Sequence, residues 1–273
     1  MKGIPRDAFF YYLVLMDSPI KASVCWSNIS YRVEQTQPID ISIPIRDPKL
    51  GEGPAAWYVG RPRFDVVENE GFIGSVAKGG NVNFTDVYFN PHGHGTHTEC
   101  LGHITKEAES INGIKLPLLI PCLLLTVSPK NINGDSIITS EKLPGGISSN
   151  EKLPNALIIR TLPNGSDKKS KDWANTNPTY LHPDFTDKLV ERGVEHLLVD
   201  LPSVDKEIDG GTLLSHKAFF RVPEAPRNKV TITEFVFIPN IVEDGLYALN
   251  LQIAPFDLDA SPSRPVIYPL SVI

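Results

Sequence analysis

Strict alternation of apolar and polar positions marks the first clear element of the chain. In residues 38–45, "PIDISIPI", four isoleucines fall on one face and polar or proline residues fall on the other. This period of two predicts a half-buried strand near a sheet edge, because proline cannot donate to a central ladder. A second strand is predicted over residues 80–89, "GNVNFTDVYF", which is rich in β-branched and aromatic residues.

Five further runs predict the remaining strands. Three of them are continuously apolar, as expected of strands that are buried on both faces, and two come late in the chain. They lie at residues 122–128, 155–161, 196–202, 229–238 and 247–255.

One helix is predicted directly before a buried strand. Pro183 is suited to the first helical position, Phe185, Leu189 and Val190 share one face, and Gly193 follows as the stop. A helix that leads into a buried strand is typical of the α/β class, so we predict an α/β fold.

Composition narrows the possible partners. Hydrophobic residues make up 41% of the 273 positions and charged residues 21%, which is enough for one sizeable core. The net charge of −6 disfavours a general electrostatic hold on nucleic acid or on an anionic membrane. Three cysteines form no disulfide framework and fit a reducing compartment, so we expect a cytoplasmic location.

The N-terminus begins with a short apolar segment at residues 8–16, "AFFYYLVLM". Nine residues are too few to span a bilayer as a helix, and no clean cleavage site follows. We therefore predict an N-terminal extension over residues 1–30, either disordered or preceding a true start at Met16, with export as the less favoured alternative. Residues 31–273 are predicted to form a single domain.

Imidazoles are concentrated in residues 90–105, "NPHGHGTHTECLGHIT", beside the carboxylate of Glu99. This segment holds four of the seven histidines of the chain, namely His92, His94, His97 and His103. Imidazole and carboxylate together suit Zn²⁺, Mn²⁺ or Fe²⁺. Residues two apart in an extended segment project to the same side, so His97 and Glu99 are expected to face one cavity. The segment predicts a metal site.

The string "HGTHTECLGH" resembles the signature H-x-G-T-H-x-D-x-P-x-H of the cyclase-like metal-dependent hydrolases, a family that includes bacterial kynurenine formamidase and isatin hydrolase. Four other segments resemble family segments in the same order: "IDISIPI", "VDLPSVD", "SHKAFF" and "DASPSR". The resemblance implies a swivelling β/β/α fold and a homodimer or higher assembly. It also implies metal-dependent hydrolysis of a C–N bond in an amide, formamide or cyclic amide.

The resemblance further implies roles for individual residues. His103 matches the histidine that transfers a proton, and Glu234 matches a glutamate that helps to position the attacking water. A small-molecule substrate and a divalent cofactor, zinc or manganese as one or two ions, are expected. The metal ligands implied are His92, His97, Glu99, His216 and Glu234.

Three departures from the signature keep an alternative open. Gly93 stands in the place of the first histidine; we assign that role to His92 through a one-residue slip, because His94 falls on the wrong parity. Glu99 replaces an aspartate, and Leu101 replaces a proline. The alternative is a non-catalytic descendant of the same fold that binds a ligand or a metal without turnover.

Two other readings concern neighbouring residues. Cys100 and His103 suggest a thiol hydrolase, which requires a thiol of depressed pKa with a base within reach. Asp205 follows a predicted strand, where α/β folds often place functional groups, and is a candidate partner for a metal ligand.

Overall fold

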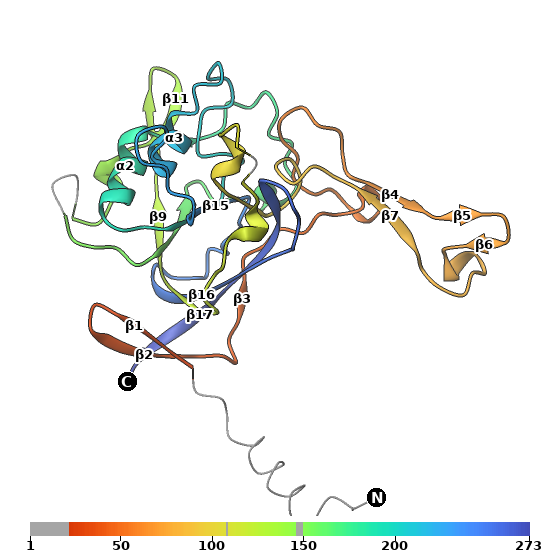
Figure 1. The fold of residues 1–273 in the computed structure, drawn as a ribbon, viewed down its shortest axis with the longest axis horizontal. Coiled ribbons are helices and arrows are strands. Elements are labelled where there is room, and N and C mark those ends of the chain that lie inside the picture. Colours follow the sequence, from red (N-terminus) through yellow and green to blue (C-terminus); the bar gives the residue numbers. More distant parts are fainter. Residues whose placement is uncertain (1–21, 108, 146–149) are drawn as a thin grey trace, which may run out of the picture.

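The computed structural model describes residues 22–107, 109–145 and 150–273, which are coloured in Figure 1. The apolar segment 8–16 and the proposed start at Met16 lie outside the described residues. Within the described part, ten strands form one large sheet. In chain order these are β1 (Ser23–Trp26), β2 (Ile29–Val33), β3 (Ile39–Asp40), β8 (His97–Glu99), β9 (Ile120–Val127), β12 (Ala156–Thr161), β14 (His196–Val199), β15 (Thr231–Glu234), β16 (Gly245–Ile253) and β17 (Ala260–Val272).

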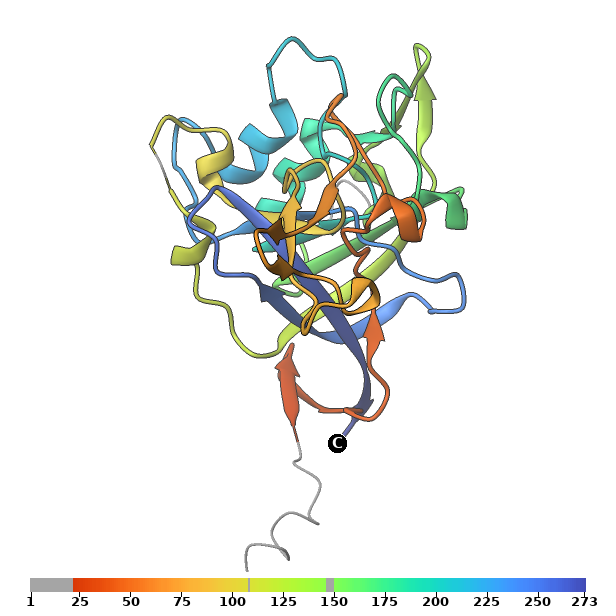
Figure 2. The ribbon, with the colours of Figure 1, turned by 90° about the vertical axis from the view of Figure 1, so that its right-hand side faces the viewer.

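The sheet closes on itself because β8 pairs with both β15 and β17. Among the described residues, the closed part contains seven strands in the order β17, β16, β9, β12, β14, β15 and β8. The strands β9, β12, β14 and β15 run parallel to their neighbours in this group, whereas the other pairs are antiparallel. Figure 2 shows the long dark-blue strand β17 crossing the body diagonally. The predicted single-domain α/β class is confirmed.

Smaller elements surround the closed sheet. Two helices cover one face of the parallel strands, α2 (Pro183–Glu191) and α3 (Leu214–Phe220). The short strands are β4 (Arg63–Val66), β5 (Glu68–Asn69), β6 (Phe72–Ile73), β7 (Thr85–Tyr88), β10 (Lys130–Ile132), β11 (Asp135–Ile138) and β13 (Tyr180–Leu181). No helix in the part of the chain that the structure describes is long and apolar enough to cross a bilayer.

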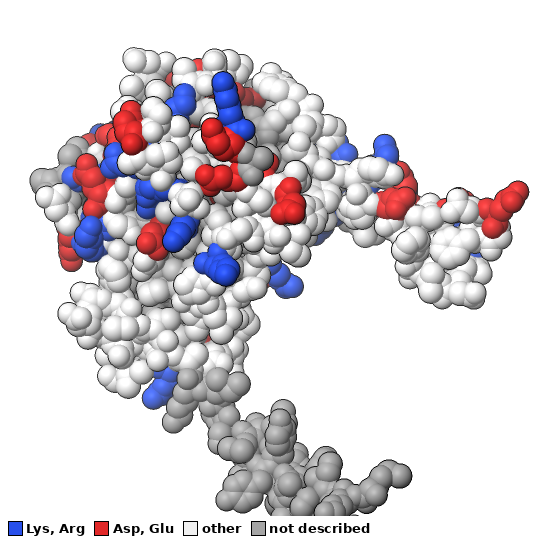
Figure 3. Space-filling view, viewed as in Figure 1, with Lys and Arg blue, Asp and Glu red and all other residues white. Residues whose placement is uncertain are grey.

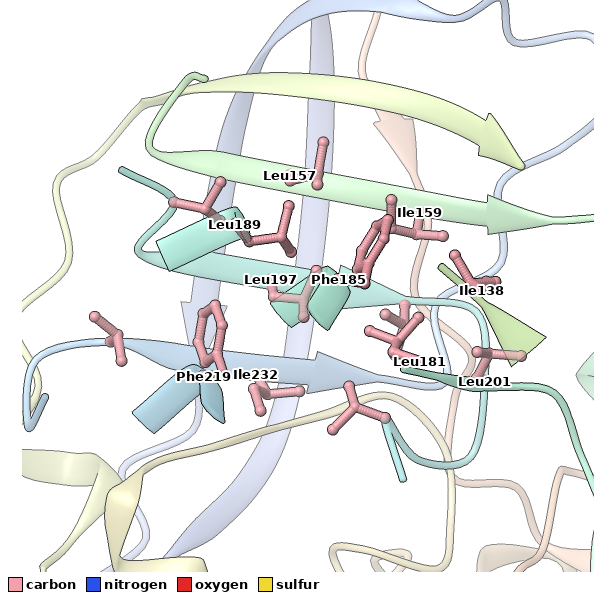
Figure 4. Packing of buried hydrophobic residues seen from close by; sticks show 14 of the residues in the cluster. Ile138, Leu157, Ile159, Leu181, Phe185, Leu189, Leu197, Leu201, Phe219 and Ile232 are labelled. Atoms are coloured by element: carbon pink, nitrogen blue, oxygen red, sulfur yellow. The ribbon is translucent and has the colours of Figure 1, made fainter. Parts of the chain in front are cut away.

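The central strand β12 is buried on both faces, as its apolar run predicts. Leu157 and Ile159 point toward the helices and pack there with Phe185 of α2 and Phe219 of α3 (Figure 4). Ile158, which lies between them, and Ala156 belong to a second cluster on the opposite face of the strand. Because parallel strands are covered on both faces, alternation disappears and a continuous apolar run replaces it.

The predicted helix is confirmed as α2. Pro183 occupies the first helical turn, the helix ends at Glu191, and Gly193 follows shortly after with a φ of 88°, in the left-handed region. The strands predicted over 122–128, 155–161, 196–202, 229–238 and 247–255 are confirmed as β9, β12, β14, β15 and β16, with shifted ends. Helix α3 was not predicted.

The strand predicted over residues 38–45 is mostly wrong, because few of these residues pair with a neighbouring strand. The predicted alternation of buried and exposed side chains is nevertheless present. Only β3 forms ladder contacts, with β17. Ile41 and Ile43 are nevertheless buried. The backbone of Ile43 bonds to Thr96, partly through the threonine hydroxyl at 2.7 Å, so a side chain replaces a ladder partner.

The sheet also begins earlier than expected. β1 and β2 form an antiparallel hairpin, and β2 joins the C-terminal end of β17. Residues 23–30, which were assigned to the extension, therefore belong to the described sheet, and the boundary at residue 31 cuts through β2.

The strand predicted over residues 80–89 is shorter and lies in an unexpected place. Only β7 is formed, and it pairs with β4. Residues 63–88, which we call the arm, extend away from the body in Figure 1. Figure 3 shows that this face of the arm is largely uncharged, with acidic side chains midway along it and at its tip and basic side chains near the body. Its exposed large apolar side chains are Phe72, Ile73, Val76, Val82, Phe84, Val87 and Tyr88.

Candidate metal centre

Strand β8 carries the first two site residues into the interior. His97 and Glu99 both have fully buried side chains, and their spacing of two places them on the same side of the strand. Thr98 points the other way and bonds through its hydroxyl to Thr233 and Ser263. The extended backbone of the histidine segment therefore separates the site face from a structural face.

Glu234 faces the same site from the neighbouring strand. It lies at the carboxyl end of β15, directly opposite His97 in the antiparallel register. The distance between His97 Nε2 and Glu234 Oε2 is 3.3 Å. The other oxygen, Oε1, accepts a hydrogen bond from the backbone N–H of Val204. The carboxylate is thus held by the loop that follows β14.

The structure separates His92 from His94. The Nδ1 atom of His92 lies 3.3 Å from Glu99 Oε2, whereas His94 turns away and contacts the carbonyl oxygen of Gly60. Position 93 has little space for a side chain, since a Cβ on Gly93 would lie 2.5 Å from Val59 Cγ2.

His103 approaches from the short 3₁₀ turn that follows β8. Its Nε2 lies 3.7 Å from Glu99 Oε2, and its Nδ1 lies 3.0 Å from Asp259 Oδ2. The ring stacks on that of His92, with 4.2 Å between the centroids. The two rings therefore lie side by side between the same two carboxylates.

His216 completes the cluster from helix α3. Its Nε2 lies 2.8 Å from Glu99 Oε1, and its Nδ1 lies 2.6 Å from Asp205 Oδ2. Asp205 also accepts hydrogen bonds from the backbone N–H groups of Ser215 and His216, so it caps the start of the helix. A carboxylate that holds the far nitrogen of an imidazole is a common support for a metal ligand.

The charged groups of the cluster shift one another's pKa values. Burial raises the pKa of Glu99, but the imidazoles of His103 and His216 outweigh this effect and hold it well below its usual range. Burial lowers the pKa of His92, but the neighbouring carboxylates of Asp259 and Glu99 prevail and raise it to about 10. The pKa of His216 is raised for the same kind of reason, by Glu99 and Asp205 against the effect of burial.

The residues fit a divalent cation. Among the buried side-chain atoms in the described ranges, His97 Nε2 and Glu99 Oε2 have no hydrogen-bond partner. Unpartnered buried polar atoms are costly, and these two are the atom types that Zn²⁺ and Mn²⁺ accept. The residues form three overlapping sets, and within each set the ligand atoms lie within 4.8 Å of one another. The sets are His92, His97 and Glu99; His92, His103 and Asp259; and Glu99, His103 and His216.

A cavity of about 350 Å³ opens onto the cluster. Trp57 and Leu213 contribute apolar surface to its wall, whereas Lys206 and Glu207 contribute charge. This volume suits a small organic molecule.

Sequence reasoning named Asp205 only as a candidate and did not name Asp259 or Trp57. Asp259 is the first residue of the segment "DASPSR", which resembles a segment of the family but for which no role was predicted. It contacts His92 and His103, which are far away in the sequence. No local pattern reveals such a contact, because register between distant strands creates it.

The geometry contradicts the thiol-hydrolase reading. The Cys100 thiol donates to the backbone carbonyl of Glu109 and makes no pair with His103 among the described contacts. Burial raises the pKa of this thiol to about 11, the opposite of what a nucleophilic cysteine requires.

Comparison with known proteins places the chain in a family. The family described as "Putative cyclase" matches residues 36–206, so the chain belongs to the cyclase family. A kynurenine formamidase from Bacillus cereus is 25% identical over 236 residues, which cover 85% of this chain and 97% of that protein. The predicted family is confirmed, and with it the prediction that the chain is an enzyme of a hydrolytic family.

Solved structures show the same fold. A predicted metal-dependent hydrolase from Bacillus stearothermophilus aligns with a TM-score of 0.58 at 17% identity, covering 85% of this chain and 98% of that one. Isatin hydrolase A from Labrenzia aggregata aligns with a TM-score of 0.55 at 13% identity, covering 85% and 93%. At these identities the likeness concerns the fold alone.

Proposed function

We propose that the protein is a metal-dependent hydrolase that cleaves a C–N bond in an amide, formamide or cyclic amide. One observation carries the proposal: nitrogen atoms of His92 and His103 approach one buried oxygen, Glu99 Oε2, and His97 offers a ligand atom within 4.8 Å of those of His92 and Glu99, beside a cavity that His92 and His103 line. The formamidase activity named for the curated relatives supports the class of bond.

The side chains with suitable ligand atoms suggest how a cation would be held. His92, His97 and Glu99 would hold it, with His216 and Glu234 available to the same ion or to a second one. A divalent cation in such a site lowers the pKa of a coordinated water and polarises a carbonyl group. Both zinc and manganese accept mixed imidazole and carboxylate ligands.

Side chains at the cavity wall supply the remaining chemistry. His103 lines the cavity and is partly exposed, which supports a role in which it accepts a proton and passes it to the leaving nitrogen. Glu234 orients the attacking water, and its own carboxylate is held in place by the backbone N–H of Val204. Trp57 offers a flat apolar wall, which favours an aryl group on the substrate.

Elemental analysis combined with hydrolysis assays tests the proposal. The purified protein should contain zinc or manganese and should hydrolyse N-formylkynurenine or isatin. The variant His97→Ala should lose both metal and activity. The variant His182→Ala is the control, because His182 is a half-exposed residue at the start of α2 and lies outside the cavity lining.

One observation favours the competing function, a non-catalytic descendant. Glu99 is already paired with His216 at 2.8 Å, so its charge is neutralised without an ion. A protein that takes up neither added zinc nor added manganese would support this alternative and overturn the proposed hydrolase.

We also propose a homodimer or a higher homo-oligomer, in a cytoplasmic location, with a small-molecule substrate and neither nucleic acid nor membrane as partner. The arm supports the assembly, because it carries a run of exposed apolar side chains. Sedimentation velocity tests the oligomeric state.

A further inference from the structure

We propose that Asp259 is a positioning residue that fixes the orientation and the proton position of two imidazoles, those of His92 and His103. In the metal-loaded protein it would thereby turn one unprotonated nitrogen of each ring toward the centre beside Glu99. The inference rests on the proposed function, since it concerns how the same metal centre is held together.

A single carboxylate oxygen makes both contacts. Asp259 Oδ2 lies 2.9 Å from His92 Nε2 and 3.0 Å from His103 Nδ1. The two rings stack with an interplanar angle of 28°, so the oxygen lies at the edge of a parallel pair. Two hydrogen bonds to one anionic oxygen hold both rings at once.

The backbone around Asp259 is fixed to the site strand. The next residue, Ala260, begins β17 and stands opposite Glu99 in the antiparallel register. The carbonyl oxygen of Asp259 accepts a hydrogen bond of 3.0 Å from the backbone N–H of Cys100. The pairing of β17 with β8 therefore fixes the position of the Asp259 carboxylate beside the histidines, and a shift of β17 along β8 would move it away from them.

The contacts decide which nitrogens can bind metal. A carboxylate accepts hydrogen bonds, so the protons lie on His92 Nε2 and His103 Nδ1. The opposite nitrogens, His92 Nδ1 and His103 Nε2, lie 3.3 Å and 3.7 Å from Glu99 Oε2. A nitrogen that ligates metal must lack a proton, and the bond made by the other nitrogen sets this choice. The two histidines therefore present different nitrogens to the centre, Nδ1 from His92 and Nε2 from His103.

The surroundings of Asp259 fit a support better than a ligand. Its side chain is 34% exposed, whereas that of Glu99 is fully buried. Both short contacts of Oδ2 are already made to imidazole nitrogens. Glu99 Oε2, a buried atom without a hydrogen-bond partner in the described cluster, lies beside the opposite nitrogens of the two rings.

Zinc affinity tests the inference without relying on turnover. Competition against a chromophoric chelator should show that Asp259→Ala binds zinc about 10–100-fold more weakly than the unmodified protein. Asp259→Asn should lose less, because its amide oxygen can still accept hydrogen bonds from the two rings, although without the negative charge that strengthens them. Asp257→Asn is the matched control: Asp257 bonds to Ser110 and Asn112 near the surface and should leave the affinity unchanged.

Nitrogen-15 NMR of the zinc-loaded, histidine-labelled protein gives a second readout, which a merely structural role would not move. The unmodified protein should show an Nε2–H signal for His92 and an Nδ1–H signal for His103. Both signals should exchange with water faster in Asp259→Asn than in the unmodified protein, because a neutral amide oxygen holds an N–H more weakly than a carboxylate does. Both signals should persist unchanged in Asp257→Asn.

The outcomes separate the two proposals. Zinc affinity that is unchanged in both Asp259 variants, or imidazole protons on the opposite nitrogens, would overturn the positioning role and leave the hydrolase proposal standing. Failure of the unmodified protein to bind zinc or manganese would instead overturn the hydrolase proposal. If Asp259→Ala does not fold, Asp259→Asn alone decides, through both readouts.

Discussion

Strands β7 and β8 follow one another along the chain and have opposite environments. Every residue of β7 is exposed, including Val87 and Tyr88, and its ladder partner is β4 of the arm. Every residue of β8 is buried, including His97 and Glu99, and the strand pairs on both edges. Apolar side chains thus face solvent while ionisable ones lie inside.

The contrast shows that burial here follows function rather than hydrophobicity. Burying a charge is expensive unless it is paired, and the charge of Glu99 is paired with surrounding imidazoles. An exposed apolar patch suggests a surface that associates. The same chain therefore departs from the usual pattern in two opposite ways, once for chemistry and once for assembly.

The largest expected effect is on catalysis at the buried strand. His103→Ala should lower kcat about 10²–10⁴-fold, because a positioned proton-transfer group is lost. Zinc content should remain close to that of the unmodified protein. Steady-state kinetics and metal analysis check this. An unchanged kcat would remove His103 from the catalytic machinery, and Val87→Ala on β7 is the control for a residue outside the site.

The next effect distinguishes the core from the arm. Phe185→Ala in α2, fully buried against β12, should reduce the free energy of unfolding by about 3–5 kcal/mol. Phe84→Ala in the arm, 58% exposed, should change it by no more than about 0.5 kcal/mol for the monomer. Urea denaturation measures both. Equal losses would show that the arm is part of the cooperative core.

A smaller effect concerns pH and the charged cluster of the metal-free protein. The folded-state pKa of His92 is raised from 6.5 to about 10, so its contribution is complete below pH 6.5 and is lost as the pH rises toward 10. The pKa of Glu99 is lowered from 4.5, so its contribution is present above that value and is lost as the pH falls below it. Stability should therefore be greatest between about pH 4.5 and pH 6.5.

Thermal unfolding across pH, with a chelator present, measures this optimum. His92→Gln should flatten the alkaline decline and leave the acid decline in place. An alkaline decline that is the same in His92→Gln would show that other groups cause it.

The smallest effect on folding is expected in the arm, where association is tested. Phe84→Ser should weaken self-association while the monomer keeps its fold. Leu50→Ser is the control, because Leu50 is 79% exposed but lies outside the arm. Sedimentation velocity at several concentrations compares the two. Equal self-association of both variants would show that the arm does not contribute to the oligomer interface.

Local signals were sufficient for some elements. Proline at the start and glycine at the end define α2, and a continuous apolar run defines β12. Helix α3 lacked such signals. Its N-cap position is Leu213, in a left-handed conformation and without a side-chain cap bond, and the carboxylate of Asp205 supplies the cap from outside the helix. A cap supplied through tertiary contact leaves no mark in the neighbouring sequence.

The site divides in the same way. His97, Glu99 and His103 lie within seven residues of one another, so a local motif and the two-residue period of a strand were enough to group them. Strand parity selected His92 over His94; in the structure the His92 ring lies beside Glu99, whereas His94 contacts the carbonyl oxygen of Gly60.

By itself the sequence determined the family, the expectation of a divalent metal and the main strands. Each of these depends on residues that are adjacent in the chain or on the short repeat of apolar positions along a strand. Only the tertiary structure decided that Asp259 and Asp205 stand behind the imidazoles, and that the arm leaves the body. Those features depend on the closure of β8 between β15 and β17, and on the register between strands more than a hundred residues apart. Such long-range pairing is a property of the packed sheet as a whole and has no local counterpart along the chain.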